Sequence, residues 1–229
     1  MTQESVWDKE YKSSKLLVKE NIPSADVVRF VKFLKKESVN IENSRVLDLG
    51  SGMGRNSFYF TEMGAKVTGL EISKTAIGIA EGNAQNASLD IQYIKQSIGE
   101  KFPVDDASVD IVLDVTSSNS LNEGEREVYL DETNRVLKNG GYFFVKALCK
   151  DGDLNAKYLL KNSPGPEKDT YIMPELGVTE RVWSKEDFIK TYEKYFSIVQ
   201  MEKKTSYSRM NNRVYKRNFW IVYMKRVNE

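Results

Sequence analysis

Residues 45–56 read Arg-Val-Leu-Asp-Leu-Gly-Ser-Gly-Met-Gly-Arg-Asn, a short apolar run closed by three glycines. The apolar run predicts a buried β-strand, and residues 55–63 predict a helix after it. Residues 66–70 form a second short, largely apolar run, so the whole segment predicts a strand, a helix and a second strand. Glycines at the turn let the backbone approach a ligand closely, and the N-terminus of the following helix offers free N–H groups to an anionic group.

Strands and helices keep alternating on both sides of this unit. Ahead of it, residues 23–37 predict an amphipathic helix that begins at Pro23-Ser24. The later predicted elements are a helix at 73–85, strands at 91–94 and 109–113, a helix that starts at Asn122 and is stopped by Asn139-Gly-Gly141, a strand at 142–145, a helix at 184–195, and strands at 198–203 and 219–225. The order predicts an α/β fold, a doubly wound, seven-stranded, mostly parallel sheet with an antiparallel C-terminal hairpin.

The composition predicts one globular domain over residues 1–229. Apolar residues make up 40% of the chain and the formal net charge is +1, which excludes an overall charge suited to polyanions. Residues 1–40 are expected to cap the domain, and the Gly-, Pro- and Asp-rich residues 150–180 to form a lid-like insertion. No apolar run reaches the roughly twenty residues of a membrane span. A lone Cys149 and a polar N-terminus favour the cytoplasm.

The chain contains no histidine. This excludes Ser-His-Asp and Cys-His catalysis and every zinc site that uses histidine. A single cysteine forms neither an intramolecular disulfide nor a multi-thiolate metal site, so no metal site is predicted. The candidates for a general base are Tyr11, Asp114 and Glu175.

Ligand-binding residues are expected just after the strands, because open α/β sheets bind ligands beyond the carboxyl ends of their strands. The glycine loop follows the first strand, and Glu71 follows the second, where a carboxylate accepts both hydroxyls of a ribose. Together they predict a nucleoside pocket. A dinucleotide fingerprint would place its third glycine at position 55, which is Arg55 here, and the third glycine is Gly54. NAD and flavin are therefore disfavoured.

The stretch Val46–Asn56 resembles the first motif of the class I S-adenosylmethionine-dependent methyltransferases, including Asp48 within the strand. Glu71 matches the acidic residue that holds the ribose in that family. Phe102–Asp110 and Leu130–Gly141 resemble two further family segments, the second with asparagine in place of the usual proline. The resemblance implies S-adenosylmethionine as cofactor, S-adenosylhomocysteine as product, and in-line displacement of the methyl group. The family's final antiparallel hairpin agrees with the strand order above.

The resemblance also implies where the cofactor would lie. Gly50, Ser51 and Gly52 would pass under its methionine part, and Ile72 would lie against adenine. Ser97 stands where the family often has an aspartate for the adenine amino group. The complete set of predicted cofactor-binding residues is Gly50, Ser51, Gly52, Arg55, Asn56, Glu71, Ile72, Ser97, Ile98 and Asp114.

The acceptor is expected to be a small molecule, bound by Trp7 and Tyr11 near the N-terminus and by Tyr158 and Tyr171 in the insertion. The chain lacks the Asp-Pro-Pro-Tyr and Pro-Cys motifs used on nucleobases, and its Trp-Asp-x-x-Tyr at 7–11 resembles tellurite-resistance and thiol methyltransferases. A soft anion such as a thiolate would need no general base, whereas an alcohol or carbon acid would.

The C-terminal segment Met201–Glu229 leaves two alternatives open. It carries eight Lys or Arg against two acids, interleaved with aromatic residues, a composition typical of RNA- or anion-binding surfaces. A solvated edge hairpin protected by lysines explains it equally. Besides the small-molecule methyltransferase, two functions therefore stay open. The first is a methyltransferase that acts on RNA or protein through this hairpin, and the second is a non-catalytic cofactor-binding module.

Overall fold

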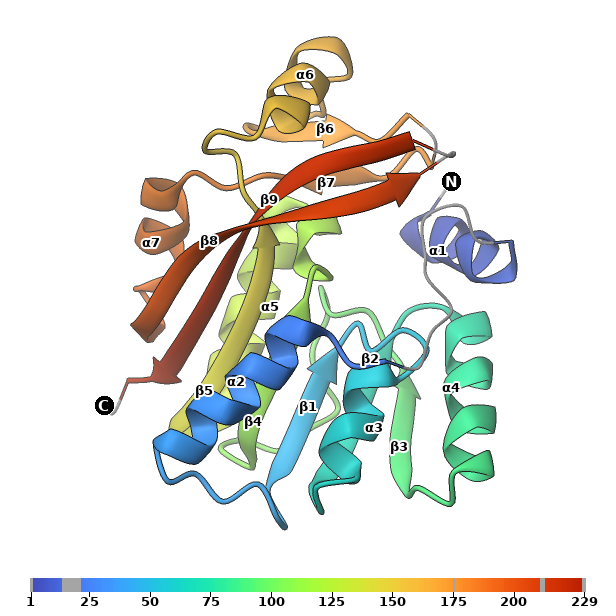
Figure 1. Ribbon diagram of the computed structural model, residues 1–229, viewed down its shortest axis with the longest axis vertical. Coiled ribbons are helices and arrows are strands. Elements are labelled where there is room, and N and C mark those ends of the chain that lie inside the picture. Colours follow the sequence, from blue (N-terminus) through green and yellow to red (C-terminus); the bar gives the residue numbers. More distant parts are fainter. Residues whose placement is uncertain (1, 14–21, 175, 211–212, 228–229) are drawn as a thin grey trace.

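The computed structural model describes residues 2–13, 22–174, 176–210 and 213–227. Its centre is a seven-stranded sheet with the order β3-β2-β1-β4-β5-β9-β8 (Figure 1). The strands are β1 (Arg45–Leu49), β2 (Lys66–Glu71), β3 (Ile91–Lys95), β4 (Val109–Val115), β5 (Leu137–Leu148), β8 (Phe196–Met210) and β9 (Arg213–Arg226). The strands from β3 to β5 pair in parallel, whereas β9 runs antiparallel to both of its neighbours. The predicted fold class is confirmed.

Helices cover both faces of the sheet (Figure 1). The helices α2 (Ala25–Lys36) and α3 (Arg55–Thr61) pack on one face, and α5 (Glu123–Val136) and α7 (Lys185–Tyr192) pack on the other. The helix α4 (Lys74–Asn86) packs on β2 and β3. Within the described residues, no helix combines the length and the apolar character that a membrane span requires.

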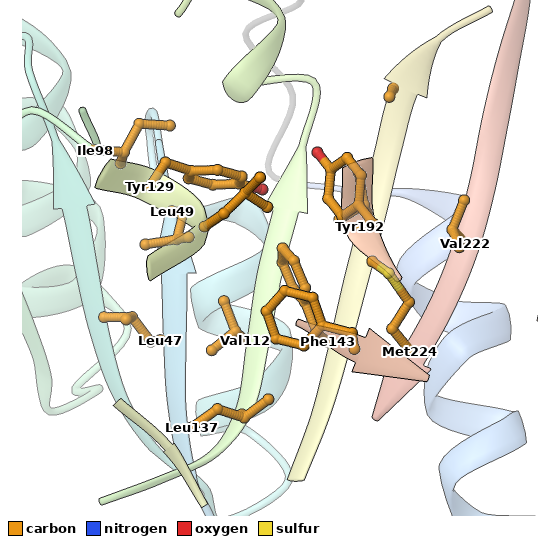
Figure 2. Packing of buried hydrophobic residues seen from close by; sticks show 14 of the residues in the cluster. Leu47, Leu49, Ile98, Val112, Tyr129, Leu137, Phe143, Tyr192, Val222 and Met224 are labelled. Carbon is orange, nitrogen blue, oxygen red and sulfur yellow. The ribbon is translucent and has the colours of Figure 1, made fainter. Parts of the chain in front are cut away.

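Aromatic rings fill the core on the face of α5 and α7 (Figure 2). Phe143 of β5 is fully buried, and its ring centroid lies 6.1 Å from that of Tyr129 in α5 and 6.4 Å from that of Tyr192 in α7. Both tyrosines are fully buried as well. These contacts fix the two helices against the strands that end at the candidate site.

Side-chain caps confirm three predicted helix starts. The Ser73 side chain accepts the N–H of Ala76 at the start of α4. Asn122 and Glu125 form a reciprocal capping box at the start of α5, and the Ser184 side chain caps α7. Each cap satisfies backbone donors that a helix N-terminus leaves free.

The predicted end of α5 is wrong. The helix ends at Val136, and Leu137 already belongs to β5, where it pairs with Val109. Leu137 is fully buried, so the chain enters the sheet at once to place this side chain in the core. The glycines at 140 and 141 lie inside β5, in a stretch where the β4–β5 register shifts, and Gly140 has a φ of 72°.

Three segments are more ordered than predicted. The last two strands are far longer than the predicted 198–203 and 219–225, because the ladder of β8 and β9 continues through polar residues. The insertion contains α6 (Leu154–Asn162) and a small sheet of β6 (Thr170–Ile172) and β7 (Thr179–Arg181). The N-terminal segment forms α1 (Gln3–Lys12), and a short 3-10 helix, η1 (Ser118–Ser120), follows β4.

Candidate functional site

The loop after β1 turns through left-handed glycines. Gly50, Gly52 and Gly54 have φ values of 65°, 57° and 87°, a region that residues with a side chain rarely adopt. The loop is also closely packed. A Cβ atom on Gly50 would lie 2.2 Å from Ser117 Oγ, and one on Gly52 would lie 2.7 Å from the Tyr11 hydroxyl oxygen. Both backbone conformation and space therefore require glycine at these two positions.

Glu71 ends β2 beside this loop and is 5% exposed. Its Oε2 accepts the N–H of Gly52 at 2.9 Å, and its Oε1 accepts the N–H of Ser73 at 2.8 Å. Burial raises the pKa of the Glu71 carboxyl, and the hydrogen bonds from backbone amides oppose that rise. An ionised carboxylate has about four lone-pair sites, and the N–H groups of Gly52, Ser73 and Ile72 already act on this one, so it keeps room for a further donor. A ribose hydroxyl fits this carboxylate.

Asp48 lies in β1, in the strand that leads into the glycine loop, and is almost fully buried. Its Oδ2 accepts the Ser57 hydroxyl at 2.7 Å, which ties α3 to the strand. Burial raises the pKa of Asp48 to about 6, although the hydrogen bond from Ser57 acts in the opposite direction. The carboxyl group that supports the loop therefore titrates just below neutral pH.

Replacing Asp48 with asparagine should flatten the pH dependence of stability between pH 4 and 7. The folded-state pKa of about 6 stands above the ordinary value of 3.8, so the stability that this group contributes is fully present below pH 4 and is lost as the pH rises through 6. The rise of the Asp48 pKa from 3.8 to about 6 corresponds to about 3 kcal/mol of stability. Urea unfolding of both proteins across this range checks the expectation, and parallel stability curves would contradict it.

The loop after β4 faces the glycine loop. Asp114 is fully buried; its Oδ1 accepts the N–H of Ser117 at 2.8 Å and its Oδ2 accepts the Tyr129 hydroxyl at 2.7 Å. Burial raises the pKa of Asp114. Thr116 has a φ of 68°, which is rare for a β-branched residue, and its N–H is bonded to β5. This turn presents Ser117, whose Oγ donates to the Gly50 carbonyl at 3.3 Å.

Helix α1 lies at the end of the sheet where strands β1, β2 and β4 finish, beside the N-terminal end of α4 (Figure 1). Asp8 of α1 accepts the Ser73 hydroxyl at 3.0 Å and the N–H of Thr75 at 2.9 Å. At the other end of α1, Gln3 donates to the Ser120 carbonyl at 2.5 Å. With Tyr11 against Gly52, the helix spans from α4 to η1 across the glycine loop.

The predicted cofactor-binding residues come from four neighbouring strand ends. They are Gly50, Ser51, Gly52, Arg55 and Asn56 after β1, Glu71 and Ile72 at the end of β2, Ser97 and Ile98 after β3, and Asp114 in β4. The side chains of two of them already accept hydrogen bonds from the backbone. Asn56 accepts the N–H of Ser24 at 3.0 Å, and Ser97 accepts the N–H of Gly99 at 3.2 Å. Parallel strands bring these residues to one edge, and their contacts with a cofactor stay predictions.

The predicted acceptor-binding residues separate into two groups. Trp7 and Tyr11 lie on α1, half-buried, and Tyr11 contacts the glycine loop. Tyr158 lies on α6 and is 63% exposed. Tyr171 in β6 is fully buried and its hydroxyl is bonded to Glu180 and Arg217, contacts that favour a structural role. Residue 175, one of the three predicted bases, lies outside the described residues.

Sequence reasoning missed two side chains at this edge. Asp8 stands inside the Trp-Asp-x-x-Tyr stretch, but its partners Ser73 and Thr75 are more than sixty residues away. Ser117 contacts Gly50 through a turn whose left-handed Thr116 carries no sequence signal. The only clue in the sequence was that Ser117 comes soon after the predicted strand at 109–113 and that Asp8 belongs to the Trp-Asp-x-x-Tyr stretch.

The residues present fit the nucleoside-bearing cofactor that the first motif implies. The glycine loop is a cradle that a Cβ atom would fill, and the Glu71 carboxylate beside it keeps room for a further donor. Ser51 Oγ is buried and has no hydrogen-bond partner among the described residues. An adenosine with a methionine chain would supply hydroxyl and amino donors to these oxygens.

Comparison with known proteins finds a family match over part of the chain. Residues 46–141 match the family described as "Methyltransferase domain". The ubiquinone biosynthesis O-methyltransferase of Pelagibacter ubique is 28% identical over 130 residues, which is 54% of this chain and 52% of that protein. The chain thus spans about half the length of this relative.

Solved structures agree on the fold. A methyltransferase from Methanosarcina mazei, described as S-adenosylmethionine-dependent, superposes with a TM-score of 0.72 at 22% identity, over 82% of this chain and 94% of that one. The 1,6-didemethyltoxoflavin-N1-methyltransferase of Burkholderia thailandensis, solved with its substrate and S-adenosylhomocysteine, gives a TM-score of 0.70 at 15% identity, over 98% and 87% of the two chains. The motif, the strand order and these matches agree: residues 46–141 match a methyltransferase domain, and the chain has the fold of solved S-adenosylmethionine-dependent methyltransferases.

Proposed function

We propose that this protein transfers the methyl group of S-adenosylmethionine to a small-molecule acceptor. The observation that carries the proposal is the buried Glu71 carboxylate, hydrogen-bonded to Gly52 of a closely packed glycine loop. Two similar proteins support a small acceptor, since one is named for ubiquinone biosynthesis and the other for methylation of 1,6-didemethyltoxoflavin.

The residues at the sheet edge would act chiefly by positioning and by excluding water. When bound, S-adenosylmethionine supplies a methyl group on a positively charged sulfur. Glu71 would hold the ribose, and Gly50 and Gly52 would let the backbone approach the methionine part. Helix α1, held by Asp8, would cover the loop, and Ser117 would line the side from which the acceptor approaches.

The two described candidates for a general base are poorly suited to remove a proton. Burial, followed by the charge of Glu71, raises the pKa of Tyr11, so this phenol stays protonated at neutral pH. Both oxygens of Asp114 are already bonded, to backbone N–H groups and to Tyr129. These surroundings favour an acceptor that is nucleophilic without a base, such as a thiolate or another soft anion.

The contacts of the C-terminal hairpin argue against RNA or protein as the acceptor. Lys204 pairs with Asp26 at 2.5 Å, and Arg217 pairs with Asp153 at 3.3 Å. Cations held by buried carboxylates are not available to phosphates. Lys204 and Arg217, at least, are therefore better explained by packing of an edge hairpin than by a nucleic-acid surface.

Thermal unfolding with S-adenosylhomocysteine or NAD, on wild type and a Glu71→Gln variant, tests the proposal. A ligand at about a hundred times its dissociation constant adds about 2.7 kcal/mol, which corresponds to a midpoint rise of roughly 5–10 °C. We expect this rise with S-adenosylhomocysteine alone. Loss of charge-assisted bonds worth about 1.5–3 kcal/mol should weaken its binding about ten- to a hundred-fold in the variant.

The next step separates an enzyme from a non-catalytic binding module. A pool of small thiols, phenols and carboxylates is incubated with labelled methyl donor, and transfer of the label is measured. Tight binding of S-adenosylhomocysteine without transfer to any pool would favour the binding module. A midpoint rise with NAD instead would overturn the cofactor assignment itself.

A further inference from the structure

Two arginines beside the insertion lack an acidic partner within the described part of the chain. Arg126 lies near the start of α5 and is 4% exposed, and Arg181 ends β7. Their hydrogen bonds go to backbone carbonyls instead, from Arg126 to Leu121 at 2.5 Å and from Arg181 to Lys168 at 3.4 Å. A buried arginine such as Arg126 is rarely left without a paired anion, and the half-buried Arg181 adds a second positive charge beside it, so this pair needs an explanation.

Both guanidinium groups lie over one indole ring. The Cζ atom of Arg126 is 5.4 Å from the ring centroid of Trp183, and that of Arg181 is 4.2 Å away. Burial, and next the positive charge of Arg181, lowers the pKa of Arg126. A cation over an aromatic face gains about 0.5–2 kcal/mol, which does not remove the repulsion between two guanidinium groups.

Three hydrogen-bond donors in this cluster point to a missing acceptor. Arg126 Nε, Arg181 Nε and Trp183 Nε1 are all buried and have no hydrogen-bond partner among the described residues. A buried donor without a partner costs about 1–3 kcal/mol, and more when it is charged. The carboxylate of Glu167 attracts Arg126 from nearby. Its Oε1 accepts the N–H of Glu123 at 2.9 Å, and its Oε2 is buried without a hydrogen-bond partner among the described residues, so none of the three donors is bonded to it.

The cluster adjoins the loop where the methyl acceptor would bind. Strand β7, which carries Arg181, packs against η1, and η1 directly follows Ser117, the residue bonded to Gly50. The carbonyl that Arg126 contacts belongs to Leu121, the first residue after η1. A group held between the arginines would thus lie on the acceptor side of the glycine loop.

We propose that Arg126, Arg181 and Trp183 form a subsite for an oxyanion, a carboxylate or phosphate group, carried by the methyl acceptor. The proposal rests on the proposed methyl transfer and narrows its acceptor to an anionic small molecule. Guanidinium groups bind such anions with charge-assisted, often bidentate hydrogen bonds. The anion would supply the acceptor atoms that the three donors lack and would relieve the repulsion between the two cations.

NMR of the arginine Nε–H groups tests the subsite without any turnover. Phosphate and, separately, acetate are titrated into the full chain at constant ionic strength, with and without S-adenosylhomocysteine. The signals are assigned with Arg126→Gln and Arg181→Gln variants. We expect both signals to move together and to saturate, and Arg126→Gln to weaken the binding seen at Arg181 at least ten-fold. Arg45→Gln, at the exposed start of β1, is the matched control and should change nothing.

The outcomes separate this inference from the proposed function. If S-adenosylhomocysteine binds but neither arginine signal saturates with either anion, the subsite is refuted while the cofactor site stands. If S-adenosylhomocysteine itself moves both signals and abolishes phosphate binding, the cofactor's carboxylate occupies the position and the acceptor assignment falls. If Arg126→Gln does not fold, Arg126→Lys keeps the charge without the planar fork and should still weaken phosphate binding, which the Arg181 signal reports.

Discussion

Replacing Gly50 with alanine should reduce the affinity for S-adenosylhomocysteine a hundred-fold or more and destabilise the protein by about 2–5 kcal/mol. The new Cβ atom would lie 2.2 Å from Ser117 Oγ and 2.5 Å from Ser117 Cβ. Rotation of the serine side chain relieves only the first contact, so the backbone of the β4 loop must move. Backbone strain at a φ of 65° costs about 1–2 kcal/mol, and overpacking adds about 1–3 kcal/mol.

The loss of affinity follows from the displaced loop. Displacements of about 1 Å at a reacting site cost about a hundred-fold in rate, and here the new methyl group would also occupy the surface along which we propose that the methionine part passes. Calorimetric titration with S-adenosylhomocysteine and urea unfolding measure the two effects.

Gly140→Ala separates backbone strain from contact. Gly140 has a φ of 72°, and a Cβ atom there would meet nothing within 4 Å. This variant should lose about 1–2 kcal/mol of stability and bind S-adenosylhomocysteine as the wild type does. Equal behaviour of Gly50→Ala and Gly140→Ala would show that the close packing of Gly50 against Ser117 has no role in binding.

The sheet was predictable because its strands carry their own signal. The strands β1, β2 and β4 contain short apolar runs, and residues such as Leu47 and Ile111 are fully buried, so periodicity places them. Of β5, only the apolar stretch 142–145 was predicted. The hairpin was underestimated for the opposite reason. Its outer part contains the polar pair Arg217 and Asn218, which are buried by contacts with Asp153, and such contacts leave no apolar pattern.

Elements held by distant contacts were not predictable. Helix α1 is mostly polar, and its position depends on Asp8 reaching Ser73. Within the candidate site, Glu71 and the glycine loop were predicted from their spacing in one strand-helix-strand unit. Arg126 and Arg181 are 55 positions apart in the sequence and meet over Trp183 because β7 folds back on η1, which no local pattern indicates.

The insertion is fastened to the hairpin by a buried ion pair, and Asp153 is its centre. The Asp153 side chain is fully buried; its Oδ2 accepts Arg217 Nε at 3.3 Å and the N–H of Asn218 at 2.7 Å, and its Oδ1 caps α6 at Ala156. Arg217 also donates to the Tyr171 hydroxyl at 3.0 Å. One carboxylate thus joins α6, β6 and β9.

Replacing Asp153 with alanine should therefore lower the free energy of unfolding by about 3–5 kcal/mol, because it leaves the Arg217 charge buried without its carboxylate. Amide hydrogen exchange in α6 and β6 should speed up more than in β1, since the insertion loses its attachment while the sheet keeps its core. Asp153→Asn retains an oxygen for the backbone donors and should lose less. The control is Glu37→Ala, which removes the exposed partner of Lys225 and should lower the free energy of unfolding by less than about 1 kcal/mol. A similarly small loss for Asp153→Ala would contradict the expectation. It would mean that solvent reaches Arg217 and that the insertion is held by apolar contacts alone.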